Sequence, residues 1–132
     1  MTAAIIEARD LVKRFDGVTA VDHISFAVPQ GVIFGFLGPN GAGKTTTIKM
    51  LTTVLKPTEG RLLIAGHDPV EEPLLVRRAF GIVFQDPSLD GELTAAENME
   101  LHGVLYRVPR AERRARIEAL LRFVGLWDRR DD

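Results

Sequence analysis

The first part of the chain has the apolar pattern of β-strands. Residues 5–12 and 20–28 are two apolar stretches with partial alternation, and Pro29-Gln30-Gly31 ends the second in a predicted turn. Residues 32–37 follow as an apolar run without a polar break. Such a run predicts a strand buried on both faces, as in a parallel sheet.

The pattern then alternates between helix and strand. Residues 46–51 predict the start of a helix that ends before Lys56-Pro57, because the residue before a proline avoids the helical conformation. Residues 61–65 and 79–84 predict two further strands.

The last part of the chain predicts two helices. Thr94 and Glu97 match a capping box, which predicts a helix from there to about Tyr106. Pro109 breaks the pattern, and a second helix is predicted to end near Gly125. Its apolar residues have the spacing of one helix face: Ile117, Leu120, Leu121 and Val124.

Composition narrows the class of protein. The 132 residues are enough for one modest domain, with 45% hydrophobic and 27% charged residues. No apolar run approaches the length of a membrane span, and the lack of cysteine excludes disulfides and thiolate metal sites. The net charge is −1, so we expect no nucleic-acid partner.

Arginine is concentrated near the end of the chain. We interpret the cluster as a solvated helix face, with a phosphate- or headgroup-binding patch as the alternative, because Glu112, Glu118 and Asp128 interrupt it. The arginines are Arg107, Arg110, Arg113, Arg114, Arg116, Arg122, Arg129 and Arg130.

The most informative segment is a glycine-rich loop with the pattern Gly-x-x-x-x-Gly-Lys-Thr. Its glycines allow the backbone N–H groups to point inward, and the helix that follows adds the positive end of its dipole. Lys44 is predicted to bridge the β- and γ-phosphates of ATP, Thr45 to bind Mg²⁺, and Thr46 to contact the α-phosphate. The predicted phosphate-binding residues are Gly38, Pro39, Asn40, Gly41, Ala42, Gly43, Lys44, Thr45 and Thr46.

Two alternative interpretations explain this loop less well than phosphate binding does. A chance glycine turn does not account for the apolar run before it and the helix after it. A dinucleotide-binding loop requires two residues and a further glycine after Gly43, where this chain has Lys44-Thr45-Thr46.

The loop resembles that of ATP-binding-cassette (ABC) nucleotide-binding domains. Phe15-Asp16-Gly17 is similar to the aromatic loop of that family, which implies that Phe15 stacks on adenine. Phe84-Gln85-Asp86 is similar to its glutamine loop, which implies that Gln85 contacts Mg²⁺ and the attacking water, with Lys44 and Gln85 as the catalytic residues. The implied fold is an α/β P-loop NTPase core with antiparallel strands at the N-terminus, over residues 1–92, and the start of a helical subdomain over residues 93–132.

Residues 84–90 and 93–98 are most similar to ATPase subunits of the daunorubicin/drug-resistance and lipid-exporter branch. The resemblance implies an ATPase on the cytoplasmic, inner face of the cell membrane. Its partners would be a separate transmembrane permease, facing residues 86–105, and a second nucleotide-binding domain, as in a homodimer.

One departure limits the expected activity. Full domains of the family continue into a Leu-Ser-Gly-Gly signature, an apolar strand ending in Asp-Glu and a switch histidine, and these 132 residues contain none of them. We expect the chain to correspond to the N-terminal part of such a domain and to hydrolyse ATP weakly or not at all by itself.

Three alternatives remain at this point. The first is a small P-loop phosphotransferase with Asp86 at the magnesium site and the arginine-rich tail as a lid. The second is a non-transport ABC-type ATPase, and the third is an interaction module without catalysis.

Overall fold

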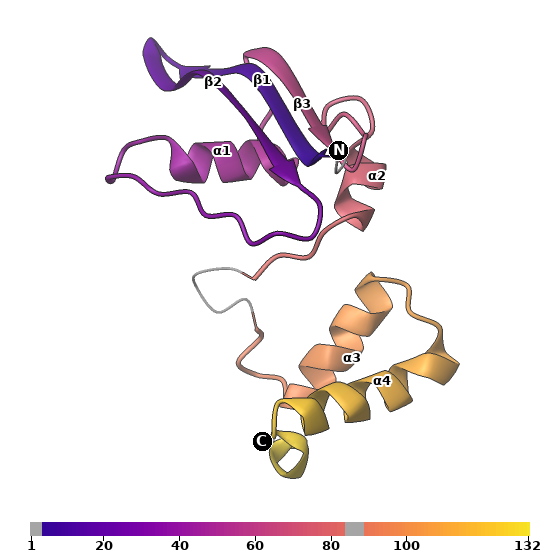
Figure 1. Ribbon diagram of the computed structural model, residues 1–132. Coiled ribbons are helices and arrows are strands. Elements are labelled where there is room, and N and C mark those ends of the chain that lie inside the picture. Colours follow the sequence, from indigo (N-terminus) through magenta and orange to yellow (C-terminus); the bar gives the residue numbers. More distant parts are fainter. Residues whose placement is uncertain (1–3, 84–88) are drawn as a thin grey trace. The chain divides into compact units, whose positions relative to one another are not determined.

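The computed structural model describes residues 4–83 and 89–132. The chain divides into two compact units, Met1–Ile82 and Val83–Asp132. The first unit consists of a sheet and two helices, and the second of two helices and a short 3-10 turn (Figure 1). The sheet therefore belongs entirely to the first unit.

The sheet has three strands in the order β2-β1-β3, and both neighbouring pairs are antiparallel. The strands are β1 (Ala4–Phe15), β2 (Val18–Pro29) and β3 (Glu59–Ile64). Asp16 and Gly17 have φ of 37° and 83°, the left-handed values that a two-residue hairpin turn requires, and Phe15 pairs with Val18 across this turn. The predicted antiparallel strands at the N-terminus are confirmed.

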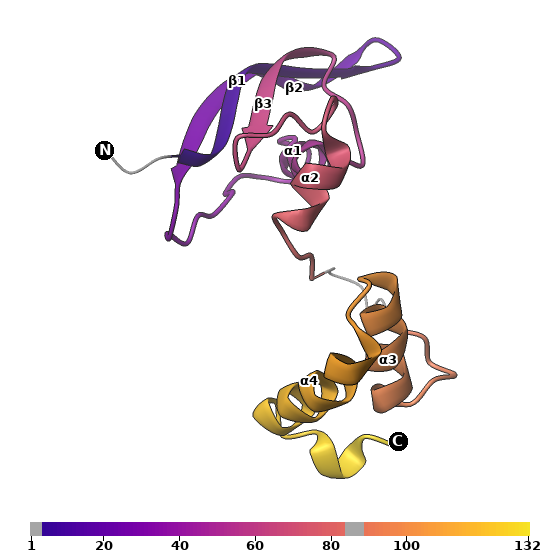
Figure 2. The same ribbon diagram turned by 90° about the vertical axis from the view of Figure 1, so that its right-hand side faces the viewer.

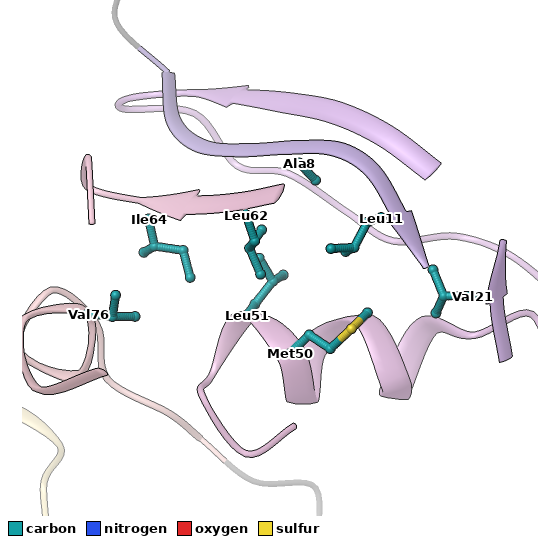
Figure 3. Close-up of a cluster of buried hydrophobic side chains, with 8 residues drawn as sticks. All are labelled: Ala8, Leu11, Val21, Met50, Leu51, Leu62, Ile64 and Val76. Atoms are coloured by element: carbon teal, nitrogen blue, oxygen red, sulfur yellow. The ribbon is translucent and has the colours of Figure 1, made fainter. Parts of the chain in front are cut away.

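One face of the sheet is covered by α1 (Lys44–Leu51) and α2 (Pro73–Arg78), which both views place on the same side (Figure 1 and Figure 2). Strand and helix side chains point toward one another in a single apolar cluster (Figure 3). Its members are Ala8, Leu11, Val21, Met50, Leu51, Leu62, Ile64 and Val76. Burial of these side chains fixes α1, and with it the loop that precedes α1, against the sheet.

Helix α2 was not predicted from the sequence. It contains six residues, with Pro73 at the first helical position and Val76 as its buried residue. A single buried position gives no periodicity, so only the packing of Val76 against the core reveals this helix.

The predicted strand at residues 32–37 is wrong. The segment forms no strand, and Ile33 and Leu37 are 104% and 96% exposed. A strand requires a partner strand for its backbone N–H and C=O groups, and no strand of the described residues pairs with this segment. Phe34 and Phe36 instead pack on Phe26 of β2, with ring centroids 5.9 and 5.2 Å from the Phe26 ring.

The predicted strand at residues 79–84 is also wrong over its described part. Ala79 is the C-cap of α2, and Ile82 and Val83 are 39% and 100% exposed. As with residues 32–37, no strand among the described residues pairs with this segment. Phe84 lies outside the described residues.

The second unit pairs α3 (Ala95–Leu105) with α4 (Arg110–Phe123), followed by the 3-10 turn η1 (Trp127–Arg129). The predicted capping box is confirmed, since Glu97 N donates to Thr94 Oγ1 at 3.2 Å and Thr94 N donates to Glu97 Oε2 at 2.9 Å. Both predicted helices are present with the expected ends.

The arginine-rich helix α4 pairs its charges along its own surface. Arg116 lies 3.0 Å from Glu112 and Arg122 lies 2.9 Å from Glu118, both at the i,i+4 spacing. This pairing supports the interpretation of the cluster as a solvated helix face.

Candidate functional site

The glycine-rich loop leads directly into α1, and its glycines have a backbone conformation that other residues rarely adopt. Gly38, Gly41 and Gly43 have φ of 155°, 85° and 80°. Gly43 is the N-cap of α1, and Ala42 N donates to Pro39 O at 3.3 Å within the loop. The glycine spacing of the sequence motif therefore corresponds to backbone requirements of this loop.

The N-terminus of α1 presents amides without intrahelical acceptors. The first helical hydrogen bond runs from Thr47 N to Gly43 O, at 2.8 Å, so the N–H groups of residues 44–46 precede it. The first turn contains no acidic residue that would compete for them. Amides and the positive end of the helix dipole together suit an anion such as phosphate.

The side chain of Lys44 folds back over the loop. Its Nζ donates to Gly38 O at 2.5 Å and to Pro39 O at 2.7 Å, which places the ammonium group inside the curve of the loop. Phosphate oxygens could take the place of these two carbonyl oxygens, because each is an acceptor for the same ammonium group.

The remaining predicted loop residues differ in exposure. Thr45 is exposed at the start of α1 and Thr46 is half-buried. Thr47 is buried and its hydroxyl donates to Gly43 O at 2.9 Å, so it supports the loop rather than facing a ligand. Five predicted residues are exposed on the loop itself: Gly38, Pro39, Asn40, Gly41 and Ala42.

Strand β2 connects the loop to Phe15. Gly43 lies against Ala20 and Val21 of β2, and Val18 of the same strand pairs with Phe15. Phe15 is 42% exposed at the end of β1. The predicted stacking residue and the glycine-rich loop thus both lie against β2.

Lys13 is a neighbour of Phe15 that no sequence motif singled out. Its Nζ lies 4.9 Å from the centroid of the Phe15 ring, within the range of a cation–π contact. The spacing of Lys13 and Phe15 could have indicated this contact, because residues two apart on a strand point to the same face.

The predicted glutamine loop lies outside the described residues. Gln85 and Asp86 both fall within residues 84–88. Over residues 4–83 and 89–132, no cluster of three or more His, Cys, Asp or Glu side chains is arranged to hold a metal ion. Of the two predicted Mg²⁺ ligands, the structure describes Thr45 alone.

Comparison with known proteins identifies the family. Residues 21–132 match the ABC transporter family. The chain belongs to this family. The predicted family is therefore confirmed.

Two curated relatives of this ABC-family chain carry drug-resistance names. It is 44% identical over 126 residues to the daunorubicin/doxorubicin resistance ATP-binding protein DrrA of Streptomyces peucetius, a match that covers 96% of this chain and 38% of the relative. It is 41% identical over 116 residues to the daunorubicin resistance ATP-binding protein DrrA3 of Streptomyces coeruleorubidus, covering 88% of this chain and 37% of the relative. The chain thus spans less than two fifths of the length of these relatives.

A solved structure confirms the α/β fold class. The ATP-binding subunit of an ABC transporter superposes with a TM-score of 0.83 at 31% identity, over 97% of this chain and 53% of that one. In the part of the chain that the structure describes, no helix combines the length and apolar character needed to cross a bilayer.

Proposed function

We propose that this chain binds Mg²⁺-ATP at residues 38–46, as part of an ATPase subunit of an ABC exporter. The observation that carries the proposal is the loop itself. Three glycines with positive φ precede α1, and the ammonium group of Lys44 lies inside the curve of that loop.

The proposal assigns separate roles to the start of α1, to Gln85 and to Phe15. The amides of residues 44–46 and the Lys44 ammonium group donate to the phosphate oxygens. The exposed hydroxyl of Thr45 is an oxygen ligand of the type that Mg²⁺ prefers, and Gln85 would supply another. Bound Mg²⁺ offsets the charge of the phosphates, and Phe15 stacks on adenine.

The wider function rests on the family and on the names of the relatives. We propose an ATPase that acts with a transmembrane permease and a second nucleotide-binding domain at the cytoplasmic face of the membrane, in the export of drug-like or lipid compounds. Membership of the ABC transporter family supports the transport role, and relatives named for drug resistance and ATP binding support a drug-like substrate. Family membership favours this function over a small phosphotransferase that acts through Asp86. The family match by itself does not separate an exporter subunit from a non-transport ABC-type ATPase, and the relatives' names favour the exporter.

Calorimetry with Lys44→Ala tests the proposal. Loss of the ammonium group removes charge-assisted hydrogen bonds to phosphate, so we expect the affinity for Mg²⁺-ATP to fall about ten- to a hundredfold. Lys49→Ala is the matched control, because Lys49 is an exposed lysine in the last turn of the same helix, and its affinity should stay within about twofold.

Two results would contradict the proposal. One is a wild-type chain that gives no heat with millimolar Mg²⁺-ATP although its circular dichroism shows a folded protein. The other is equal loss of affinity in the Lys44 and Lys49 variants. A phosphate-release assay on the same samples tests the separate expectation that these 132 residues hydrolyse ATP slowly or not at all.

A further inference from the structure

One face of the Phe15 ring is already occupied by a cation. The Nζ atom of Lys13 lies 4.9 Å from the ring centroid, on the ring's π-face. A nucleobase that stacks on Phe15 therefore has only the opposite face available.

Lys13 is held in this place by a residue distant in sequence. Its Nζ also donates to the carbonyl oxygen of Lys56, at 2.8 Å, in the loop between α1 and β3. The ammonium group thus makes two contacts at once, one with the ring and one with the backbone of that loop. An ammonium group tethered in this way restricts the ring more than a freely rotating lysine would.

The backbone of β1 on either side of Lys13 is also hydrogen-bonded to the α1–β3 loop. Thr58 N donates to Val12 O at 2.8 Å, and Arg14 N donates to Thr58 Oγ1 at 3.0 Å. Arg14 and Glu59 form an ion pair beside these bonds. The strand that carries Lys13 and Phe15 is therefore fixed on both sides of Lys13.

The ring lies within reach of a nucleotide bound at the phosphate loop. Val18, the partner of Phe15, is separated along β2 by about 7 Å from Ala20, which contacts Gly43. A ribose and its phosphates can bridge a separation of this size between ring and loop.

We propose that Lys13 is a positioning residue for the nucleobase: it holds the Phe15 ring from one side and leaves the other side for a purine. The inference rests on the proposed function, since it presupposes a nucleotide with its phosphates at residues 38–46. A ring that is already fixed loses less conformational freedom on stacking, which favours binding.

The test compares two ligands that share phosphates and differ in the base. Dissociation constants for Mg²⁺-ATP and for Mg²⁺-tripolyphosphate are measured by calorimetry on the wild type and on Lys13→Met, which keeps an unbranched stem without the charge. We expect Lys13→Met to weaken ATP binding about two- to tenfold and to leave tripolyphosphate binding within about twofold. Lys13→Arg, which retains a cation, should restore ATP binding.

Lys56→Met is the matched control. It removes the same charge from the same region, but the contact with Lys13 uses the Lys56 backbone carbonyl and the Lys56 side chain is exposed. Its affinity for both ligands should match that of the wild type.

The outcomes separate this inference from the proposed function. Unchanged ATP binding in Lys13→Met, or equal weakening of ATP and tripolyphosphate, overturns the role of Lys13 and leaves the nucleotide site intact. If the folded wild type binds neither ligand, the proposed function fails and the role of Lys13 fails with it.

Discussion

Gly43 lies so close to Ala20 that a β-carbon on Gly43 would stand 2.3 Å from the Ala20 carbonyl oxygen. The same β-carbon would be 3.2 Å from Cγ2 of Val21. The point at which the glycine-rich loop joins α1 therefore lies directly against β2. Glycine is needed here for two reasons, its φ of 80° and this close approach.

Gly43→Ala should therefore destabilise the first unit more than Gly41→Ala. Both substitutions place a side chain at positive φ, which costs about 1–2 kcal/mol. Gly41 has no atom within 4 Å of an added β-carbon, so only Gly43→Ala adds a clash with β2, of about 1–3 kcal/mol. Urea unfolding followed by far-UV circular dichroism measures both variants.

Gly35→Ala provides the baseline for this pair, because Gly35 has neither a positive φ nor a neighbour within 4 Å of an added β-carbon. The free energy of unfolding of the Gly35→Ala variant should stay within about 0.5 kcal/mol of that of the wild type. Equal destabilisation by Gly41→Ala and Gly43→Ala would show that the contact with Ala20 is unimportant.

Thr94→Ala should lower the stability of the second unit by about 1 kcal/mol, because it removes the hydroxyl that accepts from Glu97 N at the start of α3. Tryptophan fluorescence reports this unit selectively, because Trp127 is the only tryptophan of the chain. The guanidinium carbons of Arg122 and Arg130 lie 4.8 and 4.7 Å from the centroid of its ring.

Thr94→Ser keeps the hydroxyl and should unfold close to the wild type, since serine is as good an N-cap as threonine. If the alanine and serine variants lost stability to the same extent, the methyl group of Thr94 and not its cap would be responsible.

Gly103 and Arg113 should be energetically coupled where α3 crosses α4. Alanine usually stabilises a helix interior by about 1 kcal/mol relative to glycine, but a β-carbon on Gly103 would lie 2.8 Å from Cδ of Arg113. Arg113 is held nearby, with Nε 2.9 Å from Oε1 of Glu100. We expect Gly103→Ala to stabilise the chain in an Arg113→Ala background and to be neutral or destabilising in the wild type.

A double-mutant cycle measures this coupling through Trp127 fluorescence during urea unfolding. The expected interaction free energy is at least about 0.5 kcal/mol. Additive effects of the two substitutions would mean that Arg113 moves aside freely.

Local signals predicted the helices of the second unit well, whereas α2 in the first unit gave no such signal. The capping box at Thr94 and Glu97 involves residues three apart, and the helix over Arg110–Phe123 follows from its own apolar spacing. The apolar run at residues 32–37 gave a wrong prediction, because the apolar character of a segment does not show which backbone pairs with it.

The amino-acid sequence was enough to predict the glycine-rich loop and the family, because the glycines, Lys44 and the start of α1 are neighbours in the chain. The tertiary structure alone decided that Gly43 rests on Ala20 and that Lys13 lies over Phe15 while bound to Lys56, 43 residues away. Contacts of this kind depend on how the strands and α1 pack together, and that packing is set by side chains scattered over the whole first unit.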